Sequence, residues 1–112
     1  MRLFGSAPPP AVSPADSIKK LRNTIDMLDK REQHLERKAN DEVVEAKRKL
    51  ATKNRRGAMM CLKRKKAYES QIQRLMGARM TLEEQVMAIE AANVNLEAMN
   101  AMRQGAKTMS SI

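Results

Sequence analysis

The sequence is poor in the residues from which compact cores are built. Its 112 residues include no tryptophan, one tyrosine and one phenylalanine, so aromatic side chains make up only 2% of the chain. Ordinary globular cores depend on several large aromatic side chains, so this composition argues against one. The single cysteine, Cys61, excludes an internal disulfide and predicts a reducing, intracellular environment.

Reactive side chains are equally scarce. His34 is the only histidine, and together with Cys61 it cannot supply a metal-ligand set, a Cys/His pair or a Ser/His/Asp triad. The chain has no glycine-rich phosphate loop. The adjacent carboxylates Glu83 and Glu84 lie among polar helical residues and are interpreted as surface charge. We therefore expect no enzymatic activity, no cofactor and no bound metal.

Long apolar runs are missing as well. No segment approaches the roughly 20 apolar residues of a membrane-spanning helix, and the N-terminus lacks the apolar region of a signal peptide. Arg2 excludes the N-myristoylation pattern, which requires glycine at that position. We therefore expect a soluble, cytoplasmic protein whose contacts with membranes are peripheral.

Helix-forming residues, by contrast, are abundant, because Ala, Met, Leu, Glu, Lys, Arg and Gln dominate the chain. Ser13 is the predicted N-cap of a first helix, with Pro14 at its first position and Asp16 completing a capping box. Apolar residues then recur at steps of three and four, interrupted by Glu32. This pattern predicts a helix over about residues 14–51.

A turn is expected at Thr52, Lys53 and Asn54, although no proline enforces it and one continuous helix is an alternative. Thr52 or Asn54 would cap a second helix over about residues 54–112. This helix carries its own seam with alternating steps of three and four, and the seam includes two charged residues, Lys65 and Arg79.

The two expected helices differ in length. At 1.5 Å per residue they span about 57 Å and about 90 Å, so the first covers only about two-thirds of the second. The remaining apolar residues of the second helix, including Ile89 and Leu96, then lack an internal partner, which usually marks an interface. We therefore predict an all-α fold, a long helical hairpin with an extended second helix, that assembles with other subunits.

A dense basic block lies near the expected turn. Ten Lys or Arg residues occur between Lys47 and Lys66, and no Asp or Glu occurs between Glu45 and Glu69. The formal net charge is +9. Charges of this density must face water or a polyanion, since burying them unpaired costs several kcal/mol each. The block is either a solvated helix face or a docking surface for anionic lipid or nucleic acid.

Several segments resemble the ESCRT-III family. They are residues 12–29 with the run IKKLR, the block 61–66, and above all residues 89–96, IEAANVNL. Residues 102–107 are similar to the branch of the main filament-forming subunit, so the resemblance implies assembly side by side into filaments. The resemblance implies a helical core over residues 13–112 that polymerises on endosomal and other membranes, for multivesicular body sorting and for membrane scission and repair. It implies as partners anionic lipids, further copies of the chain, other ESCRT-III subunits and upstream ESCRT factors.

Members of that family continue into an acidic half that folds back on the core and carries motifs for the disassembly ATPase. The present sequence ends at Ile112, so we expect it to correspond to the core alone. Residues 1–12 are expected to form a flexible membrane-anchoring tail, because a short N-terminal segment contacts lipid in the family.

The predicted membrane site combines two apolar residues of the tail with cations of the second helix. Lys65 is left out because it falls on the packing seam. The membrane-binding residues are Leu3, Phe4, Arg55, Arg56, Lys63, Arg64 and Lys66.

The predicted polymer interface combines an acidic row of heptad spacing with neighbouring apolar residues, and the row is expected to meet the basic block of a staggered neighbour. Its residues are Met76, Met80, Glu83, Met87, Ile89, Glu90 and Glu97.

Parts of this sequence are also compatible with two other functions. A basic block followed by heptads is also the outline of a basic-leucine-zipper DNA-binding protein. Such proteins place Arg or Lys eight residues after the DNA-reading Asn, but Leu62 lies there relative to Asn54, and steps of seven from Ile72 reach Arg79 and Asn93. We therefore expect no nucleic-acid partner. A coiled-coil scaffold without membrane contact is the remaining alternative.

Overall fold

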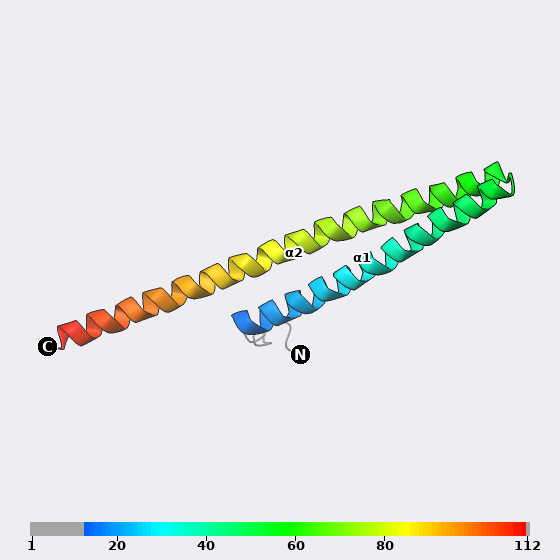
Figure 1. Ribbon diagram of the computed structural model, residues 1–112. Coiled ribbons are helices and arrows are strands. Elements are labelled where there is room, and N and C mark those ends of the chain that lie inside the picture. The colour runs from blue at the N-terminus through cyan, green and yellow to red at the C-terminus, as the bar shows by residue number, and fades with distance from the viewer. Residues whose placement is uncertain (1–12, 112) are drawn as a thin grey trace, which may run out of the picture.

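The protein is a hairpin of two long helices. The computed structural model describes residues 13–111, in which α1 (Pro14–Ala51) and α2 (Arg55–Ser110) run antiparallel (Figure 1). No strand occurs in this range, and the molecule is 89 Å long. The predicted all-α hairpin with an extended second helix is confirmed. The predicted boundary between a tail and the core falls at the edge of the described residues and stays a prediction.

Both helices begin at polar caps. The Oγ of Ser13 accepts a hydrogen bond from the backbone N–H of Asp16 at 3.1 Å, with Pro14 in the first turn, as predicted. Of the two cap candidates for α2, Asn54 is the one used, because its Oδ1 accepts the backbone N–H of Gly57 at 2.9 Å. A Cβ on Gly57 would lie 2.6 Å from the Nδ2 of Asn54, so glycine leaves room for the capping amide.

The turn ends α1 with a Schellman motif. The backbone N–H of Asn54 bonds the carbonyl of Lys49 at 2.7 Å, and that of Lys53 bonds the carbonyl of Leu50 at 2.9 Å. Lys53 accordingly has a φ of 62°, in the left-handed region where glycine is usual. A lysine in this conformation carries backbone strain. Because the position is not a glycine, the sequence gives only a weak indication of the turn.

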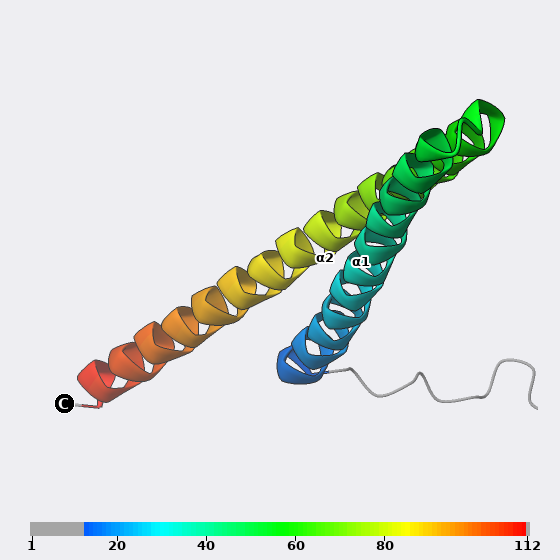
Figure 2. The ribbon, with the colours of Figure 1, turned by 45° about the vertical axis from the view of Figure 1, so that its right-hand side comes forward.

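The helices lie closest near the turn and diverge toward the start of α1 (Figure 2). The buried residues next to the turn are small, namely Ala46, Ala58 and Cys61, and they form one cluster. Farther along, larger residues such as Leu35 and Ile72 occupy the seam. Because the distance between packed helices follows the size of the side chains between them, this gradient explains the divergence.

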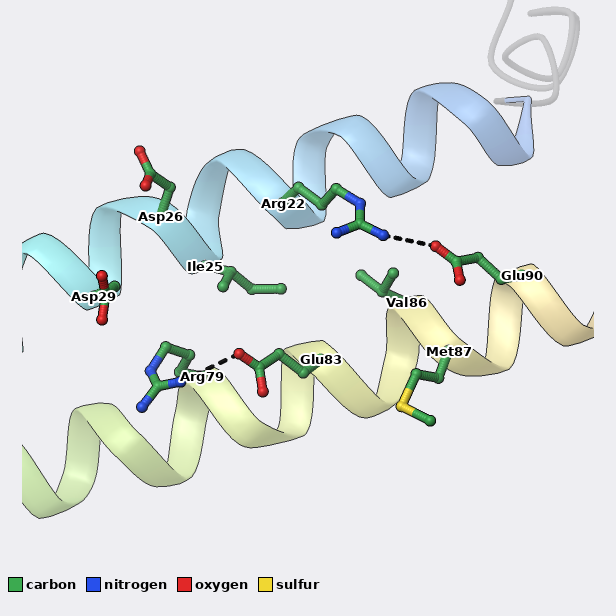
Figure 3. Close-up of a pocket in the computed structure, with 9 residues that line it drawn as sticks. All are labelled: Arg22, Ile25, Asp26, Asp29, Arg79, Glu83, Val86, Met87 and Glu90. Atoms are coloured by element: carbon green, nitrogen blue, oxygen red, sulfur yellow. Dashed lines mark hydrogen bonds and ion pairs between the residues drawn. The ribbon is translucent and has the colours of Figure 1, made fainter.

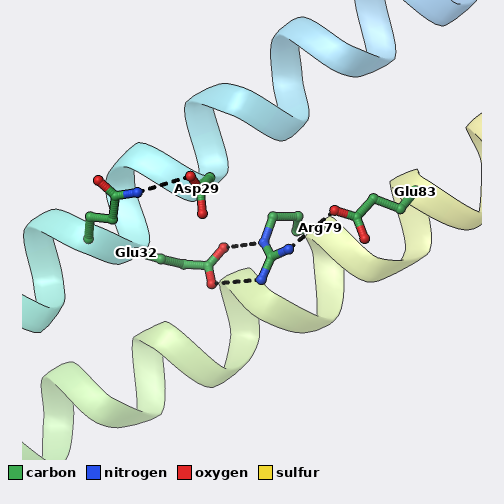
Figure 4. Close-up of polar contacts among 5 residues, drawn as sticks. Asp29, Glu32, Arg79 and Glu83 are labelled. Atoms are coloured by element: carbon green, nitrogen blue, oxygen red, sulfur yellow. Dashed lines mark hydrogen bonds and ion pairs between the residues drawn. The ribbon is translucent and has the colours of Figure 1, made fainter.

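A buried ion pair joins the helices beyond Ile72. The carboxylate of Glu32, 7% exposed, accepts bonds from the Nε of Arg79 at 2.7 Å and from its NH2 group at 3.3 Å (Figure 4). Arg79 also donates to Glu83 at 3.2 Å. Its pKa is raised above the usual range by the hydrogen bond to Glu32. Two of the three charged residues that interrupt the apolar stripes, Glu32 and Arg79, thus satisfy each other.

Replacing Lys53 tests the strain in the turn. We expect Lys53→Gly to raise the free energy of unfolding by roughly 1 kcal/mol, because glycine adopts the left-handed conformation without a Cβ clash. Lys53→Ala is the matched control, since it removes the same charge and keeps the Cβ. Chemical denaturation measures both variants, and an equal gain in the two would show that charge, not backbone strain, matters.

Replacing Arg79 tests the buried pair. Arg79→Met leaves the Glu32 carboxylate buried without its donors, and an unsatisfied buried acceptor costs about 1 to 3 kcal/mol. Glu32→Leu combined with Arg79→Met should recover most of the loss, because an apolar pair in the same space is often neutral or stabilising. Thermal unfolding followed by circular dichroism measures both. Arg103→Met, on an exposed part of α2, should change nothing.

Candidate functional site

The first candidate surface is the outward face of α2 beside the turn. Ala58 and Cys61 are buried against α1 and so define the inner face of α2 here. Successive helical residues are about 100° apart, which places Arg56 and Lys63 on the opposite side and Lys66 at its edge. All three are exposed, as is Arg55 at the edge of this face. We call these four residues the basic face.

Arg64, the fifth predicted lipid-binding cation, is positioned differently. Its Nε donates to Glu42 of α1 at 2.8 Å, and its NH2 group lies 3.4 Å from the Sγ of Cys61. The hydrogen bond from Arg64 holds the pKa of the Glu42 carboxyl below its usual range. The sequence did not predict Glu42 as a partner of Arg64, because Glu42 lies outside the stretch without Asp or Glu. Only the folding of the hairpin brings the two residues together. Arg64 therefore joins the two helices, apart from the basic face.

Two further side chains of α2 near the turn, Lys65 and Tyr68, are half-buried. Lys65 is half-buried on the seam side and its Nζ lies 3.8 Å from Glu69. Lys38 of α1 lies over the ring of Tyr68, 5.9 Å from its centroid. The predicted tail residues Leu3 and Phe4 lie outside the described residues.

The second candidate surface is the part of α2 that extends past α1. Asn93 is the last half-buried residue, and residues 94–110 are exposed along the whole circumference of the helix (Figure 1). We call this segment the arm. It exposes five large apolar side chains, which are Val94, Leu96, Met99, Met102 and Met109.

The predicted acidic row begins beside α1 and continues onto the arm. Glu83 pairs with Arg79 of its own helix, and Glu90 accepts a bond from Arg22 of α1 at 2.8 Å (Figure 3). In this pair, 63% of the Arg22 side chain and 47% of the Glu90 side chain are exposed. Glu97 lies on the arm and is exposed. Two of the three predicted acidic residues thus have partners within their own chain.

An open groove lies between the helices at this end of the hairpin. It has a volume of about 510 Å³, and both Arg22 and Glu90 line it. Ile25, Val86 and Met87 contribute apolar surface to it (Figure 3). The groove marks the place where the diverging helices no longer fill the space between them.

The predicted apolar interface residues do not all lie together. Met80 and Met87 are exposed, at 54% and 67%, and Val94 continues their spacing of seven. Ile89 is half-buried and, two residues after Met87, lies about 200° around the helix from it. Met76 is also half-buried, beside Ile72. The structure therefore brings together a row of Met80, Met87 and Val94, and Val94 could have been found from its heptad spacing.

Within residues 13–111 no group of three or more His, Cys, Asp or Glu side chains is placed to hold a metal ion. In the same range, neither helix has an apolar stretch long enough to cross a bilayer. His34 is exposed and Cys61 is buried.

Comparison with known proteins gives a consistent family. The Snf7 family model matches residues 16–112. Charged multivesicular body protein 4 of Dictyostelium discoideum is 39% identical over 109 residues, which are 97% of this chain and 50% of that protein. Charged multivesicular body protein 4b of Xenopus tropicalis is 44% identical over 96% of this chain and 49% of its own length.

A plant relative matches in the same way. Vacuolar protein sorting-associated protein 32 homolog 1 of Arabidopsis thaliana is 39% identical over 96% of this chain and 50% of its own length. The chain spans about half the length of the curated relatives that it matches.

Proposed function

Because the chain belongs to the Snf7 family, we propose that it is a non-enzymatic subunit of a membrane-remodelling polymer. The ESCRT-III resemblance inferred from the sequence is confirmed by this membership, since the relatives are ESCRT-III subunits of the branch expected. In this proposal the chain binds acidic membranes, self-assembles into filaments, and acts in multivesicular body sorting and membrane scission. It works in the cytoplasm, peripherally on endosomal and other membranes, with other ESCRT-III subunits and upstream ESCRT factors.

One observation supports both parts of this proposal. The basic face and the arm lie at opposite ends of one continuous helix, α2, and neither is covered by α1. A cationic surface attracts a polyanion, and an exposed apolar surface is typical of an interface between proteins. One subunit can therefore offer cations to a membrane or to a neighbour's acidic row at one end of α2, and apolar side chains to a neighbour at the other end.

The membrane contact would use two signals. The basic face lies in a stretch without acidic residues, and each Lys or Arg near an anionic leaflet adds about 1 kcal/mol to binding. Leu3 and Phe4 together would add about 3 to 5 kcal/mol on burial, before the cost of ordering. Either signal alone gives weak, reversible attachment, whereas two together give stable anchoring.

A nucleic-acid partner is disfavoured by the packing of the same segment. The side of α2 that carries Ala58 and Cys61 is buried against α1, so a groove of DNA could not surround this helix as it surrounds a basic-zipper helix. Duplex DNA serves as the competing ligand in the test below.

Charge reversal tests the basic face. Changing Arg55, Arg56, Lys63 and Lys66 to Glu should abolish binding to vesicles of phosphatidylserine and phosphatidylcholine at physiological salt. Arg64 is left unchanged so that its bond to Glu42 still joins the helices.

The control reverses four exposed cations elsewhere, namely Lys19, Lys20, Arg103 and Lys107. Each reversal lowers the formal net charge by two, so the net charge of both variants falls from +9 to +1. Co-sedimentation with vesicles measures binding. Equal loss in both variants would show that net charge, not the basic face, governs attachment, and stronger binding to duplex DNA would contradict a lipid partner.

The polymer contact would be heterologous and staggered, with the acidic row of one subunit beside the basic block of the next. Such a contact does not close on itself and so extends into a filament. Exposed ion pairs contribute only about 0.5 kcal/mol each, so the affinity must come mainly from burial of apolar side chains such as Met80 and Met87. The charges would set the stagger.

Glu90 allows a sharp test, because it already pairs with Arg22 in its own chain. We expect Glu90→Arg to block filament formation and a second reversal, Arg56→Glu or Lys63→Glu, to restore it in part. Arg22→Gln is the matched control: it removes the internal pair, leaves the Glu90 carboxylate available to a neighbour, and should still polymerise. Light scattering and negative-stain microscopy at one salt concentration measure assembly. If Arg22→Gln fails in the same way as Glu90→Arg, the internal pair is what assembly requires and the charge-register hypothesis is wrong.

A further inference from the structure

Two methionines stand exposed within the basic face. Met59 and Met60 lie between Arg56 and Lys63 in the sequence, and their exposures are 64% and 49%. Each is three or four residues from both cations, so on a helix all four side chains are neighbours on one side. The side opposite is the one that packs on α1 through Ala58 and Cys61. The hairpin itself therefore gives these methionines no apolar partner.

The surroundings of the two methionines restrict what could cover them. The local surface is strongly cationic, because no Asp or Glu occurs between Glu45 and Glu69. A second copy of this same surface would be repelled by its charge, whereas the acidic row of a staggered neighbour would match it and is one outcome of the test below. Nucleic acid would match the charge but offers phosphates, not an apolar layer, to a helix face of this kind. An anionic bilayer offers both, since its phosphates lie directly above hydrocarbon.

We propose that Met59 and Met60 insert between lipid headgroups while Arg56 and Lys63 bind the headgroup phosphates. This inference rests on the proposed membrane function and adds a second insertion point to it, on α2 itself and independent of Leu3 and Phe4. A helix lying in the membrane interface commonly buries an apolar stripe flanked by cations. Methionine suits this position because its unbranched, polarisable side chain adapts to an irregular environment.

The two kinds of side chain contribute to binding in different ways. Binding by the cations weakens as salt screens their charges, whereas burial of the methionines is nearly independent of salt. Loss of the methionines should therefore lower the affinity at every salt concentration by a similar factor. Loss of a cation should instead reduce the dependence on salt.

The test replaces both methionines in the full chain. Met59→Gln with Met60→Gln keeps side-chain length and helix propensity but makes both side chains polar. We expect the affinity for phosphatidylserine-containing vesicles to fall about tenfold, with an unchanged salt dependence. The control is Met27→Gln with Val44→Gln, which makes two exposed apolar side chains of α1 polar, away from the basic face, and should bind like the original chain.

A second measurement reports insertion directly. Met59→Cys in a Cys61→Ala background allows an NBD fluorophore to be attached at residue 59, and both thermal unfolding and circular dichroism verify the fold. We expect a blue shift on adding vesicles and quenching by lipids brominated in the acyl chains. Normal vesicle binding with neither change would overturn the inference and leave the proposed membrane function intact. No vesicle binding by the original chain would instead overturn the proposed function itself. Weaker self-association of the Gln variant without vesicles would assign the methionines to a contact between subunits.

Discussion

A single layer of side chains separates α1 from α2. The size of the side chains in this seam determines the shape of the hairpin. Alanines and a cysteine beside the turn allow the helices to approach closely. Leucine and isoleucine, and then a glutamate–arginine pair, hold them farther apart. Because a seam of this kind has no second layer, every residue of α2 that α1 does not reach is left exposed. The exposure of both the basic face and the arm follows from this single constraint.

Charge pairs between the helices then select one alignment of this narrow seam. Arg22 meets Glu90, Glu32 meets Arg79, and Glu42 meets Arg64. The order of signs along α1 is positive, negative, negative, and the residues of α2 that face them are negative, positive, positive. Sliding α1 toward the arm until Glu32 faced Glu90 would oppose two carboxylates, so the sequence of charges disfavours that alternative. The pairs thus reinforce the alignment that the short turn between Ala51 and Arg55 sets.

Local features of this fold could be predicted from the sequence, and features that depend on alignment could not. The apolar periodicity and the Ser13 cap involve residues close in sequence, and both helices were predicted on that basis. The turn gave a weak signal because Lys53 occupies a conformation that glycine usually marks. Glu32 and Arg79 were both recognised as interruptions, yet a simple reflection about Lys53 would place Arg74 opposite Glu32. The assignment of Arg64 to the membrane surface overlooked Glu42 for the same reason, since the partner comes from the other helix.

The uninterrupted course of α2 has a mechanical consequence. Its 56 residues include the basic face near one end and the arm at the other, with no break in the helix between them. A rod of this kind acts as a lever, because a small tilt at one end becomes a large displacement at the other. Any change in the slope of the surface on which the basic face rests would therefore be transmitted, enlarged, to the arm of the same subunit. In a row of subunits, local bending of the support and the spacing between neighbours would be coupled through the stiffness of a single helix.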